Sequence, residues 1–357
     1  MQQLILSLKT ASKTTRLSVH SNREHVFMTI VRHSSEELAQ FNSPREQFGF
    51  RKDAVLDELK KADIDINEIA IIVCKGGVIK PMPGGVYKLN KAMLDDISHP
   101  MAEHESNLGV LIAEEIAKRS IHDIQAVIVD PACVDEMSEL AKLSGLPEIT
   151  RKSIMHTLSQ RTVATNYANT LGKKYENINV IVAHLGSGIS VGVHCKGQII
   201  DVNDGLTGDG PMSPSRTGDL PVGQLIEMCY SGKYSKEEMM LKIYKKGGMK
   251  AYLGTSNAVE VEKQFMAGDR KAKLIFDGIA YQVAKEIGAL STVLEGKVDG
   301  IIITGGLAHC QYIVDEIIKR VNHLGDVTTY SGDNEINALA MNGYMVLRGE
   351  IDVKEYI

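Results

Sequence analysis

The chain contains two stretches in which apolar strand-like runs alternate with polar turns. In the first, strand-like runs are expected at 4–8, 17–20 and 25–31, with the polar segment 9–16 between the first two. In the second, a buried-type run at 180–183 is broken by glycines and resumes with period two at 189–194. The same order of strand, polar turn and strand in both halves predicts a duplicated domain.

Helical spacing of apolar residues accounts for much of the remaining chain. It predicts helices over 34–42, 45–62, 108–119, part of 151–171, 222–231, 236–245, 271–295 and 335–348, the last capped by Asp333 or Asn334. Buried strands are expected at 69–74, 126–129 and 298–303. This alternation predicts an α/β protein of two domains, 1–150 and 151–334, with the C-terminal segment 335–357 packing back on the first domain.

Composition agrees with a globular protein of this size. Of the 357 residues, 43% are hydrophobic and 24% are charged, and the net charge of −5 argues against a nucleic-acid partner. No apolar stretch is long enough for a membrane span, and the N-terminus lacks the pattern of a signal peptide. The five cysteines are scattered and never form C-x-x-C, so we expect reduced thiols and a cytoplasmic protein.

Several loops combine glycine with groups that suit a phosphoryl or carboxylate ligand. Gly186 and Gly188 follow the strand at 180–183, and Arg216 lies in the next glycine-rich loop. This hairpin is either a phosphate loop or an ordinary glycine turn. Asp130 ends the strand at 126–129, either as a ligand-site carboxylate of a parallel strand or as a turn residue before proline. Gly305-Gly306 also follow a strand and precede a helix, as in nucleotide sites.

Taken together, these loops resemble the butyrate kinase family. The strings are MPGGVY (82–87), EHESNLG (103–109), VDPACVDEM (129–137), RKSIMHTLSQRTVA (151–164), AHLGSGIS (183–190), IDVNDGLTGDGPMSPSRTGDLP (200–221), YLGTSNA (252–258) and ITGGLAH (303–309). They cover nearly the whole chain in order. The family is related to acetate kinase, within the sugar kinase–heat-shock ATPase–actin superfamily. The resemblance therefore implies two duplicated ribonuclease-H-like domains, with ATP and the acyl substrate in a cleft between them.

The resemblance also implies a reaction and the residues that perform it. ATP and a short carboxylate, such as butyrate or a branched acid, would react reversibly to ADP and an acyl phosphate by direct in-line transfer. His184 and Arg216 match residues that stabilise the phosphoryl group, His104 matches a second active-site histidine, and Asp130 and Glu335 match carboxylates near magnesium. The remaining matches are Lys75, Pro83 and Gly84 for the substrate, and Ser12, Thr14, Arg16, Gly186, Gly188, Asn257, Gly305 and Gly306 for phosphate and nucleotide. A homo-oligomer is expected on the resemblance alone.

Structural interpretations of the same residues remain open. A single histidine such as His184 or His104 is often a hydrogen-bonded core residue rather than a catalyst. Glu335, at the start of a helix, can also complement the helix dipole.

The chain departs from the family where the chemistry is expected. The family's first phosphate loop reads close to N-P-G-S-T-S-T-K, and here Lys9, Ala11 and Arg16 replace its asparagine, glycine and lysine. Ala11 does not readily adopt positive φ. Lys75 replaces a family arginine, which keeps the charge but loses the bidentate fork. In the family's S-D-x-R string, the two charged positions are Asn257 and Val259.

These departures suggest two hypotheses. In the first, the Lys9 ammonium lies near where magnesium would sit between Asp130 and Glu335 and weakens the dependence on metal. In the second, the chain is a weakened or inactive paralogue that binds nucleotide or acyl phosphate in a regulatory role. A third interpretation, an actin-like filament protein, is disfavoured because it leaves the carboxylate-kinase strings unexplained.

Overall fold

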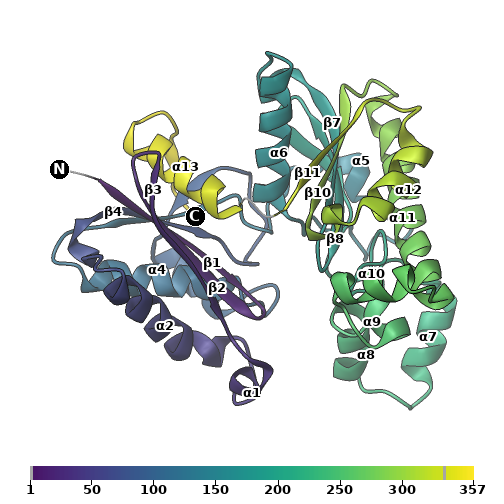
Figure 1. Ribbon diagram of the computed structural model, residues 1–357, viewed down its shortest axis with the longest axis horizontal. Coiled ribbons are helices and arrows are strands. Elements are labelled where there is room, and N and C mark those ends of the chain that lie inside the picture. Colours follow the sequence, from purple (N-terminus) through teal and green to yellow (C-terminus); the bar gives the residue numbers. More distant parts are fainter. Residues whose placement is uncertain (1–2, 333–334) are drawn as a thin grey trace. The chain divides into compact units, whose positions relative to one another are not determined.

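The computed structural model describes residues 3–332 and 335–357, which form two compact units (Figure 1). Unit 1 takes the described residues up to Val134 together with those from Glu335 onward, and unit 2 takes the described residues from Asp135. The change of domain expected at 151 thus lies inside unit 2. The segment before it is tied to that unit, because the Ser138 N–H donates to the Ile200 carbonyl oxygen at 2.9 Å.

Unit 1 is built on a mixed sheet. Its strands are β1 (Leu4–Ala11), β2 (Thr14–Ser21), β3 (Glu24–Arg32), β4 (Ile69–Lys75), β5 (Val86–Lys88), β6 (Gln125–Val129) and β12 (Val353–Lys354). The order across the sheet is β12-β5-β6-β4-β1-β2-β3. β1, β2 and β3 form an antiparallel meander, whereas β4 and β6 run parallel to β1.

Unit 2 repeats this plan. Its strands are β7 (Asn179–Leu185), β8 (Ile189–Cys195), β9 (Gln198–Val202), β10 (Gly300–Gly305) and β11 (Val327–Ser331), in the order β11-β10-β7-β8-β9. β7 to β9 form an antiparallel meander, and β10 and β11 lie parallel to β7. The order corresponds strand for strand to β6-β4-β1-β2-β3 of unit 1. The expected duplicated α/β fold is therefore confirmed.

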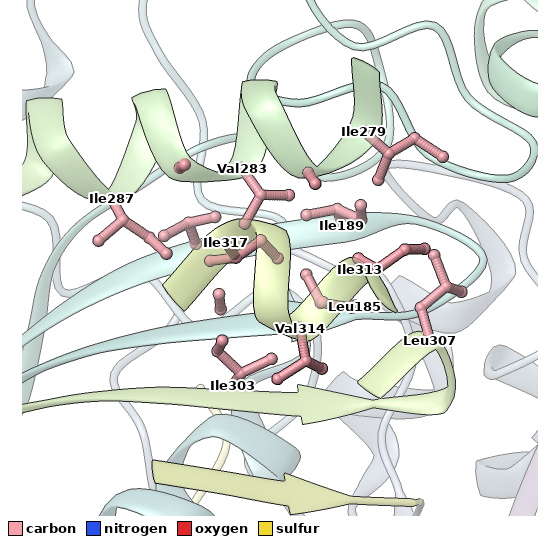
Figure 2. Packing of buried hydrophobic residues seen from close by; sticks show 14 of the residues in the cluster. Leu185, Ile189, Ile279, Val283, Ile287, Ile303, Leu307, Ile313, Val314 and Ile317 are labelled. Atoms are coloured by element: carbon pink, nitrogen blue, oxygen red, sulfur yellow. The ribbon is translucent and has the colours of Figure 1, made fainter. Parts of the chain in front are cut away.

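Helices cover both faces of the unit 2 sheet. α11 (Arg270–Ser291) and α12 (Gln311–Val321) pack on one face, where Ile279 and Val283 of α11 lie over Ile189 of β8 and Val314 of α12 lies beside Ile303 of β10 (Figure 2). α6 (Thr157–Thr170) covers the other face, with Tyr167 buried against the alternate residues of the strands. The strands are apolar on both faces because both faces are buried.

Unit 1 has the same layering. α4 (Asn107–Arg119) and α2 (Phe48–Lys61) share a core with Leu6 and other even-numbered residues of β1. α13 (Glu335–Leu347) packs on β1 and β4 from the opposite face, where an added methyl at Gly343 would meet Ile5 and Val73 at 2.7 Å. The expected cap of this last helix, Asp333 or Asn334, lies outside the described residues.

The remaining helices are shorter. They are α1 (Ser35–Leu38), α3 (Lys91–Ser98), α5 (Glu139–Lys142), α7 (Val222–Tyr230), α8 (Lys236–Tyr244), α9 (Gly248–Leu253) and α10 (Ala258–Met266). The helix expected over 34–42 is thus limited to α1, and the one expected over 271–295 ends as an α-helix at Ser291. Across the described residues, none of the helices combines the length and apolarity that a membrane span requires.

Candidate active site

The carboxyl ends of three neighbouring strands of unit 1 carry predicted site residues. Lys9 lies near the end of β1, Lys75 ends β4, and Asp130 directly follows β6. The parallel registers pair Leu8 with Cys74 and Lys75 with Val129, so the three positions are neighbours along one sheet edge. This is the edge at which α/β sheets bind ligands.

Glu335, the first residue of α13, lies between the ammonium groups of Lys9 and Lys75. Its carboxylate is buried, with Lys9 Nζ at 2.6 Å from Oε2 and Lys75 Nζ at 2.7 Å from Oε1. Burial alone would raise the pKa of the Glu335 carboxyl, but the ammonium groups of Lys75 and Lys9 together hold that pKa well below its usual range. Glu335 is therefore an ionised carboxylate with an ammonium group on each oxygen.

This arrangement does not fit a divalent cation at Glu335. A magnesium ligand needs an oxygen that faces the metal, and each oxygen of Glu335 already faces an ammonium group. Within 3–332 and 335–357, no group of three or more histidine, cysteine, aspartate or glutamate side chains is placed to hold a metal ion. Lys9 is thus an ion-pair partner of Glu335, the carboxylate that the resemblance assigns to magnesium.

Asp130 has an unusual backbone. Its φ is +40°, in the left-handed region, although it is not glycine and precedes Pro131, which disfavours compact backbone conformations. Such a conformation costs about 1–3 kcal/mol and is found most often at functional sites. Its buried carboxylate accepts the Gly85 N–H at 2.8 Å, and its own N–H donates to the Gly85 carbonyl at 3.0 Å. Asp130 is therefore held against the 83–85 loop.

The predicted substrate residues Pro83 and Gly84 lie in that same loop. The Tyr87 hydroxyl donates to the Pro83 carbonyl at 2.8 Å, and Lys354 Nζ of β12 donates to the Gly84 carbonyl at 2.6 Å. Gly85 has φ +135° and so requires glycine. The C-terminal segment was expected to pack on the first domain, but the contact of Lys354 with this loop was not predicted.

His104 occupies a partly exposed position before α4. Its Nδ1 accepts the backbone N–H of Ser106 at 3.1 Å, so the proton of a neutral ring is on Nε2, which lies 3.9 Å from a Glu105 oxygen. The Thr10 hydroxyl donates to the Glu105 carbonyl at 2.7 Å and ties this segment to β1 beside Lys9. His104 also lines a cavity of about 10 Å³, room for one water molecule.

The predicted phosphate residues Ser12, Thr14 and Arg16 lie on the β1–β2 hairpin. The polar segment expected as a turn over 9–16 is mostly strand, since Lys9 pairs with Arg16 and Ala11 with Thr14. Ala11 does not have positive φ, so its replacement of glycine is accommodated by a two-residue turn. The segment adopted the strand structure because its threonines favour extended backbone.

A buried arginine that the sequence analysis missed supports this hairpin. Arg51 of α2 is fully buried, and its guanidinium donates to the carbonyl oxygens of Ala11 at 2.8 Å, Ser12 at 2.9 Å and Thr14 at 3.1 Å. Burial lowers the pKa of Arg51, with the nearby Glu105 carboxylate opposing that shift. A single arginine on an amphipathic helix gives no sequence signal that it points inward.

In unit 2, His184 lies near the carboxyl end of β7 and is buried. Its Nδ1 lies 2.9 Å from the Ser159 hydroxyl of α6. The ring of His156 stacks on it, with 3.9 Å between centroids and 13° between planes. His156 was not among the predicted catalytic residues. Its place in the RKSIMHTLSQRTVA string was the available signal, which names a region and not a residue.

The glycines after β7 allow close approach of the His184 ring and the Arg216 guanidinium. A methyl at Gly186 would lie 3.0 Å from His184 Nε2, and a methyl at Gly188 would overlap the Arg216 guanidinium. Arg216 also donates to the Gly205 carbonyl. The Gly186 N–H donates to the Gly188 carbonyl at 3.0 Å, so it closes the turn itself. The structure thus brings His184, both glycines and Arg216 together.

The loop that contains Ser213, Ser215 and Arg216 is hydrogen-bonded to this glycine turn. The hydroxyl groups of Ser213 and Ser215 donate to the Ser187 carbonyl at 2.7 and 2.9 Å. The Arg216 N–H in turn donates to the Ser213 hydroxyl at 3.1 Å. The position of Arg216 is therefore set by the glycine turn as well as by its own loop.

The Gly305-Gly306 pair lies beside the same turn. β10 is parallel to β7, and Thr304 pairs with His184. Gly305 has φ +96°, and a methyl there would come 2.6 Å from the Leu185 carbonyl oxygen. The exposed side chain of Asn257 caps α10 by accepting the Val259 N–H at 3.2 Å, and its contact with nucleotide stays a prediction.

Comparisons with known proteins agree with the family resemblance seen in the sequence. The acetokinase family matches residues 53–350. Butyrate kinase 1 of Clostridium acetobutylicum is 44% identical over 353 residues, covering 99% of each chain. Butyrate kinase 2 of the same organism is 44% identical over 357 residues, covering 100% of each chain.

Solved structures share the fold. Porphyromonas gingivalis acetate kinase matches with a TM-score of 0.76 and 17% identity, over 97% of this chain and 100% of that one. A propionate kinase from Francisella tularensis subsp. tularensis SCHU S4 matches with a TM-score of 0.76 and 17% identity, over 95% and 98%. At this identity the likeness establishes the two-domain architecture.

Proposed function

The chain belongs to the acetokinase family, and from this membership we propose that it transfers a phosphoryl group between ATP and a short carboxylate. In the forward direction, a carboxylate oxygen of butyrate or a branched short-chain acid attacks the γ-phosphorus in line. The bond to the β,γ-bridging oxygen breaks, and the products are ADP and an acyl phosphate. The observation that carries the proposal is the convergence of His184, Gly188 and Arg216 at the end of β7, in a chain 44% identical to butyrate kinases over its full length.

In this proposal, unit 2 binds the phosphates of the nucleotide. Negative charge spreads over the oxygens of the moving phosphoryl group, and fixed donors stabilise that charge without reorganising. His184 and Arg216 are held by β7 and by the hydrogen bonds to the Ser187 carbonyl, so they have the rigidity that such donors need. Each donor of this kind is typically worth about 2.7–4 kcal/mol at the barrier. The glycine pair Gly305-Gly306 would lie against the nucleotide.

The proposal gives unit 1 the carboxylate substrate. Lys75 offers a point charge at the end of β4, and Pro83 and Gly84 lie in the loop that Asp130 and Lys354 hold. His104 and the hairpin residues Ser12, Thr14 and Arg16 complete the unit 1 groups on the family resemblance. Lys75 has no bidentate fork, so recognition of the acid rests on charge more than on geometry.

Magnesium enters this proposal with the phosphates of ATP, the usual way in which a kinase acquires it. Glu335 is not assigned to the metal, because Lys9 and Lys75 each lie on one of its oxygens. Asp130 remains the candidate carboxylate for positioning metal or substrate.

The test is a coupled ADP-release assay, with acyl-hydroxamate detection, across a panel of straight and branched short carboxylates. We expect ADP and acyl phosphate to form in equal amounts with at least one acid. Arg216→Ala should lower kcat about 10²–10³-fold. Arg320→Ala, which removes a guanidinium paired with Glu316 on α12, is the matched control and should leave kcat unchanged. No acyl phosphate with any acid, from folded protein, would contradict the proposal.

A homo-oligomer in the cytoplasm completes the proposal. Support for association comes from α7, whose apolar side chains are exposed, with Val222 at 67%, Ile226 at 52% and Tyr230 at 88%. Contiguous exposed apolar residues of this kind mark interaction surfaces. Light scattering after size exclusion measures the assembly, and a monomeric mass at micromolar concentration would contradict it.

A further inference from the structure

Five polar side chains of unit 2 form a continuous hydrogen-bonded run. Tyr175 Oη lies 2.7 Å from His194 Nδ1, and His194 Nε2 lies 3.0 Å from Gln160 Oε1. Gln160 Nε2 lies 2.9 Å from Ser190 Oγ, which lies 2.9 Å from His156 Nδ1. His194, Gln160 and Ser190 are fully buried. The run ends at His156, the ring that stacks on His184.

The backbone of β8 determines which way the Gln160 amide faces. The amide nitrogen lies 3.2 Å from the carbonyl oxygen of Ser190, and a carbonyl oxygen can only accept. A reversed amide would place two acceptor oxygens against each other. The NH₂ group therefore faces Ser190, and the Gln160 carbonyl oxygen faces His194. Gly192 makes room for this oxygen, because a methyl at Gly192 would overlap it.

This orientation determines the tautomer of His194. The Gln160 oxygen only accepts, so His194 Nε2 carries a hydrogen and donates it. Burial, aided by the nearby Arg161 charge, lowers the pKa of His194 to about 3, so the ring is neutral. His194 Nδ1 is then a lone pair, and it accepts the Tyr175 hydroxyl hydrogen.

The donors and acceptors around Ser190 likewise determine the tautomer of His156. Ser190 Oγ accepts one N–H from Gln160 at 2.9 Å and the backbone N–H of His156 at 3.3 Å. Its single hydroxyl hydrogen is left for His156 Nδ1 at 2.9 Å. His156 Nδ1 is therefore an acceptor, and the hydrogen of the neutral ring is on Nε2.

We propose that Gln160 and Ser190 are positioning residues that hold His156 as the Nε2–H tautomer, so that it presents an N–H donor to the transferring phosphoryl group. The inference rests on the proposed function. Phosphoryl oxygens only accept hydrogen bonds, so the opposite tautomer would face them with a lone pair. The stacking of His156 on His184 then fixes the plane in which this donor lies.

The first test measures the tautomer in the unaltered protein. Ring ¹⁵N shifts of ¹⁵N-histidine-labelled protein at pH 8, with His156 assigned by its absence from His156→Gln, should show a protonated Nε2 and an unprotonated Nδ1. A protonated Nδ1 in the unaltered protein would overturn the inference. This measurement does not depend on turnover, so it separates failure of the positioning inference from failure of the proposed function.

Two variants then change the hydrogen-bonded run. Ser190→Ala removes the donor to His156 Nδ1, and the ring should become a mixture of tautomers while kcat falls about 10–100-fold. Gln160→Met removes the NH₂ donor, which leaves Ser190 Oγ able either to donate to His156 Nδ1 or to accept a hydrogen from it. The His156 ring should then become a mixture of tautomers, as in Ser190→Ala.

Ser291→Ala is the matched control. It removes another buried serine hydroxyl of unit 2, one that donates to the Gly288 carbonyl at 2.7 Å on α11. It should change neither the His156 shifts nor kcat. A Ser190→Ala protein that matches Ser291→Ala in both readouts would also overturn the inference.

Discussion

At the scale of single residues, charge compensation determines what Glu335 can do. A buried carboxylate is tolerated only where opposite charges or hydrogen bonds replace its hydration. Lys9 and Lys75 supply two positive charges against one negative charge, so the cluster has a net charge of +1. A site that binds magnesium through carboxylates would instead be negative before the metal arrives. This cluster already has the sign that an anionic substrate requires.

Replacing Lys9 should restore a dependence on divalent cation. In Lys9→Asn, Glu335 keeps only the Lys75 ammonium, and one oxygen becomes available to a metal. With all ATP present as its magnesium complex, the unaltered protein should show a shallow dependence of acyl-hydroxamate formation on additional magnesium, and Lys9→Asn a steeper one. Mn²⁺ binding followed by electron paramagnetic resonance provides a second readout, and it should tighten about tenfold, or about 1.4 kcal/mol.

Lys61→Asn is the control for this experiment, since Lys61 is an exposed partner of Glu58 on α2. It should resemble the unaltered protein in both measurements. A sharp dependence on this additional magnesium in the unaltered protein, equal to that of Lys9→Asn, would refute the displaced-metal hypothesis.

Glu286 should make stability fall as pH rises. Burial first, and then the Asp209 and Asp219 carboxylates, raise the pKa of Glu286 from 4.5 to about 7 against the opposing charge of Arg151. The folded state therefore holds a proton that the unfolded state releases at lower pH, and stability is lost as pH rises from 4.5 through 7. Glu286→Gln removes this loss. Relative to the unaltered protein, its free energy of unfolding should therefore rise by about 1–2 kcal/mol between about pH 5 and pH 8.

Urea unfolding at the two pH values measures this effect. Glu227→Gln, on the exposed face of α7, removes a carboxylate without this environment and should show the pH dependence of the unaltered protein. The same pH dependence in Glu286→Gln would contradict the assignment.

The sequence located residues correctly where a motif coincides with the end of a strand, although their roles remain predictions, and it did not indicate which charged side chains are buried. Lys75 and Asp130 follow directly from the ends of β4 and β6. Arg51 could not be predicted, because its role depends on carbonyl oxygens of a hairpin about 40 residues earlier in the chain. The return of the C-terminal helix to the first domain and the nearness of Lys9 to Glu335 were expected, but the direct ion pairs of Glu335 with Lys9 and Lys75 were not.

At the scale of elements, the glycine turn after β7 and the loop that carries Arg216 are held together by hydrogen bonds and close packing. Ser213 and Ser215 hold the Ser187 carbonyl, while Gly188 leaves space for the Arg216 guanidinium. The sequence indicated both glycines and the arginine as groups that suit a phosphoryl or carboxylate ligand. The structure adds the close approach of side chains, which depends on contacts between segments that sequence periodicity does not describe.

Gly188→Ala should therefore displace Arg216. The added methyl would overlap the guanidinium and lie 2.8 Å from the Gly205 carbonyl oxygen, so the arginine must move. Activity should fall about 10²–10³-fold, as for loss of one phosphoryl donor. Gly288→Ala on α11 meets nothing within 4 Å and should leave kcat unchanged while stabilising the helix by up to about 1 kcal/mol. Equal activity of the two variants would show that Gly188 is not needed for this reason.

Element prediction was most reliable for the strands and long helices that have strong periodicity. The central strands β4, β6, β7 and β10 and the helix α11 were expected close to their observed positions. β11 was missed because its residues Val327–Ser331 are partly exposed and largely polar, so they lack the apolar run of a buried strand. The β1–β2 turn was placed too broadly because polar threonines were interpreted as loop.

At the scale of the whole molecule, the duplicated order of strands explains why the chain must return to its beginning. Unit 2 supplies its own covering helices α6, α11 and α12, whereas β1 and β4 of unit 1 are covered on one face by α13, the last helix of the chain. The duplication was predicted from two hairpins of slight sequence similarity, because topology depends on the pattern of apolar positions more than on residue identity. Unit 1 is complete only when the C-terminal residues have been made.

A substitution on α13 should consequently weaken unit 1 and spare unit 2. Gly343 faces the sheet, and even a methyl there would come 2.7 Å from Ile5 Cγ2 and Val73 Cγ2, whose β-branched side chains have little freedom to move. Gly343→Val should destabilise unit 1 by about 1–3 kcal/mol through overpacking. Native-state hydrogen exchange should show lost protection in peptides from β1 and β4, with β7 and β10 unchanged. Gly49→Val on α2, where nothing lies within 4 Å of an added methyl, is the control. Equal loss of protection in both units would mean that the two fold as one cooperative body, and the independent packing of unit 2 would have to be abandoned.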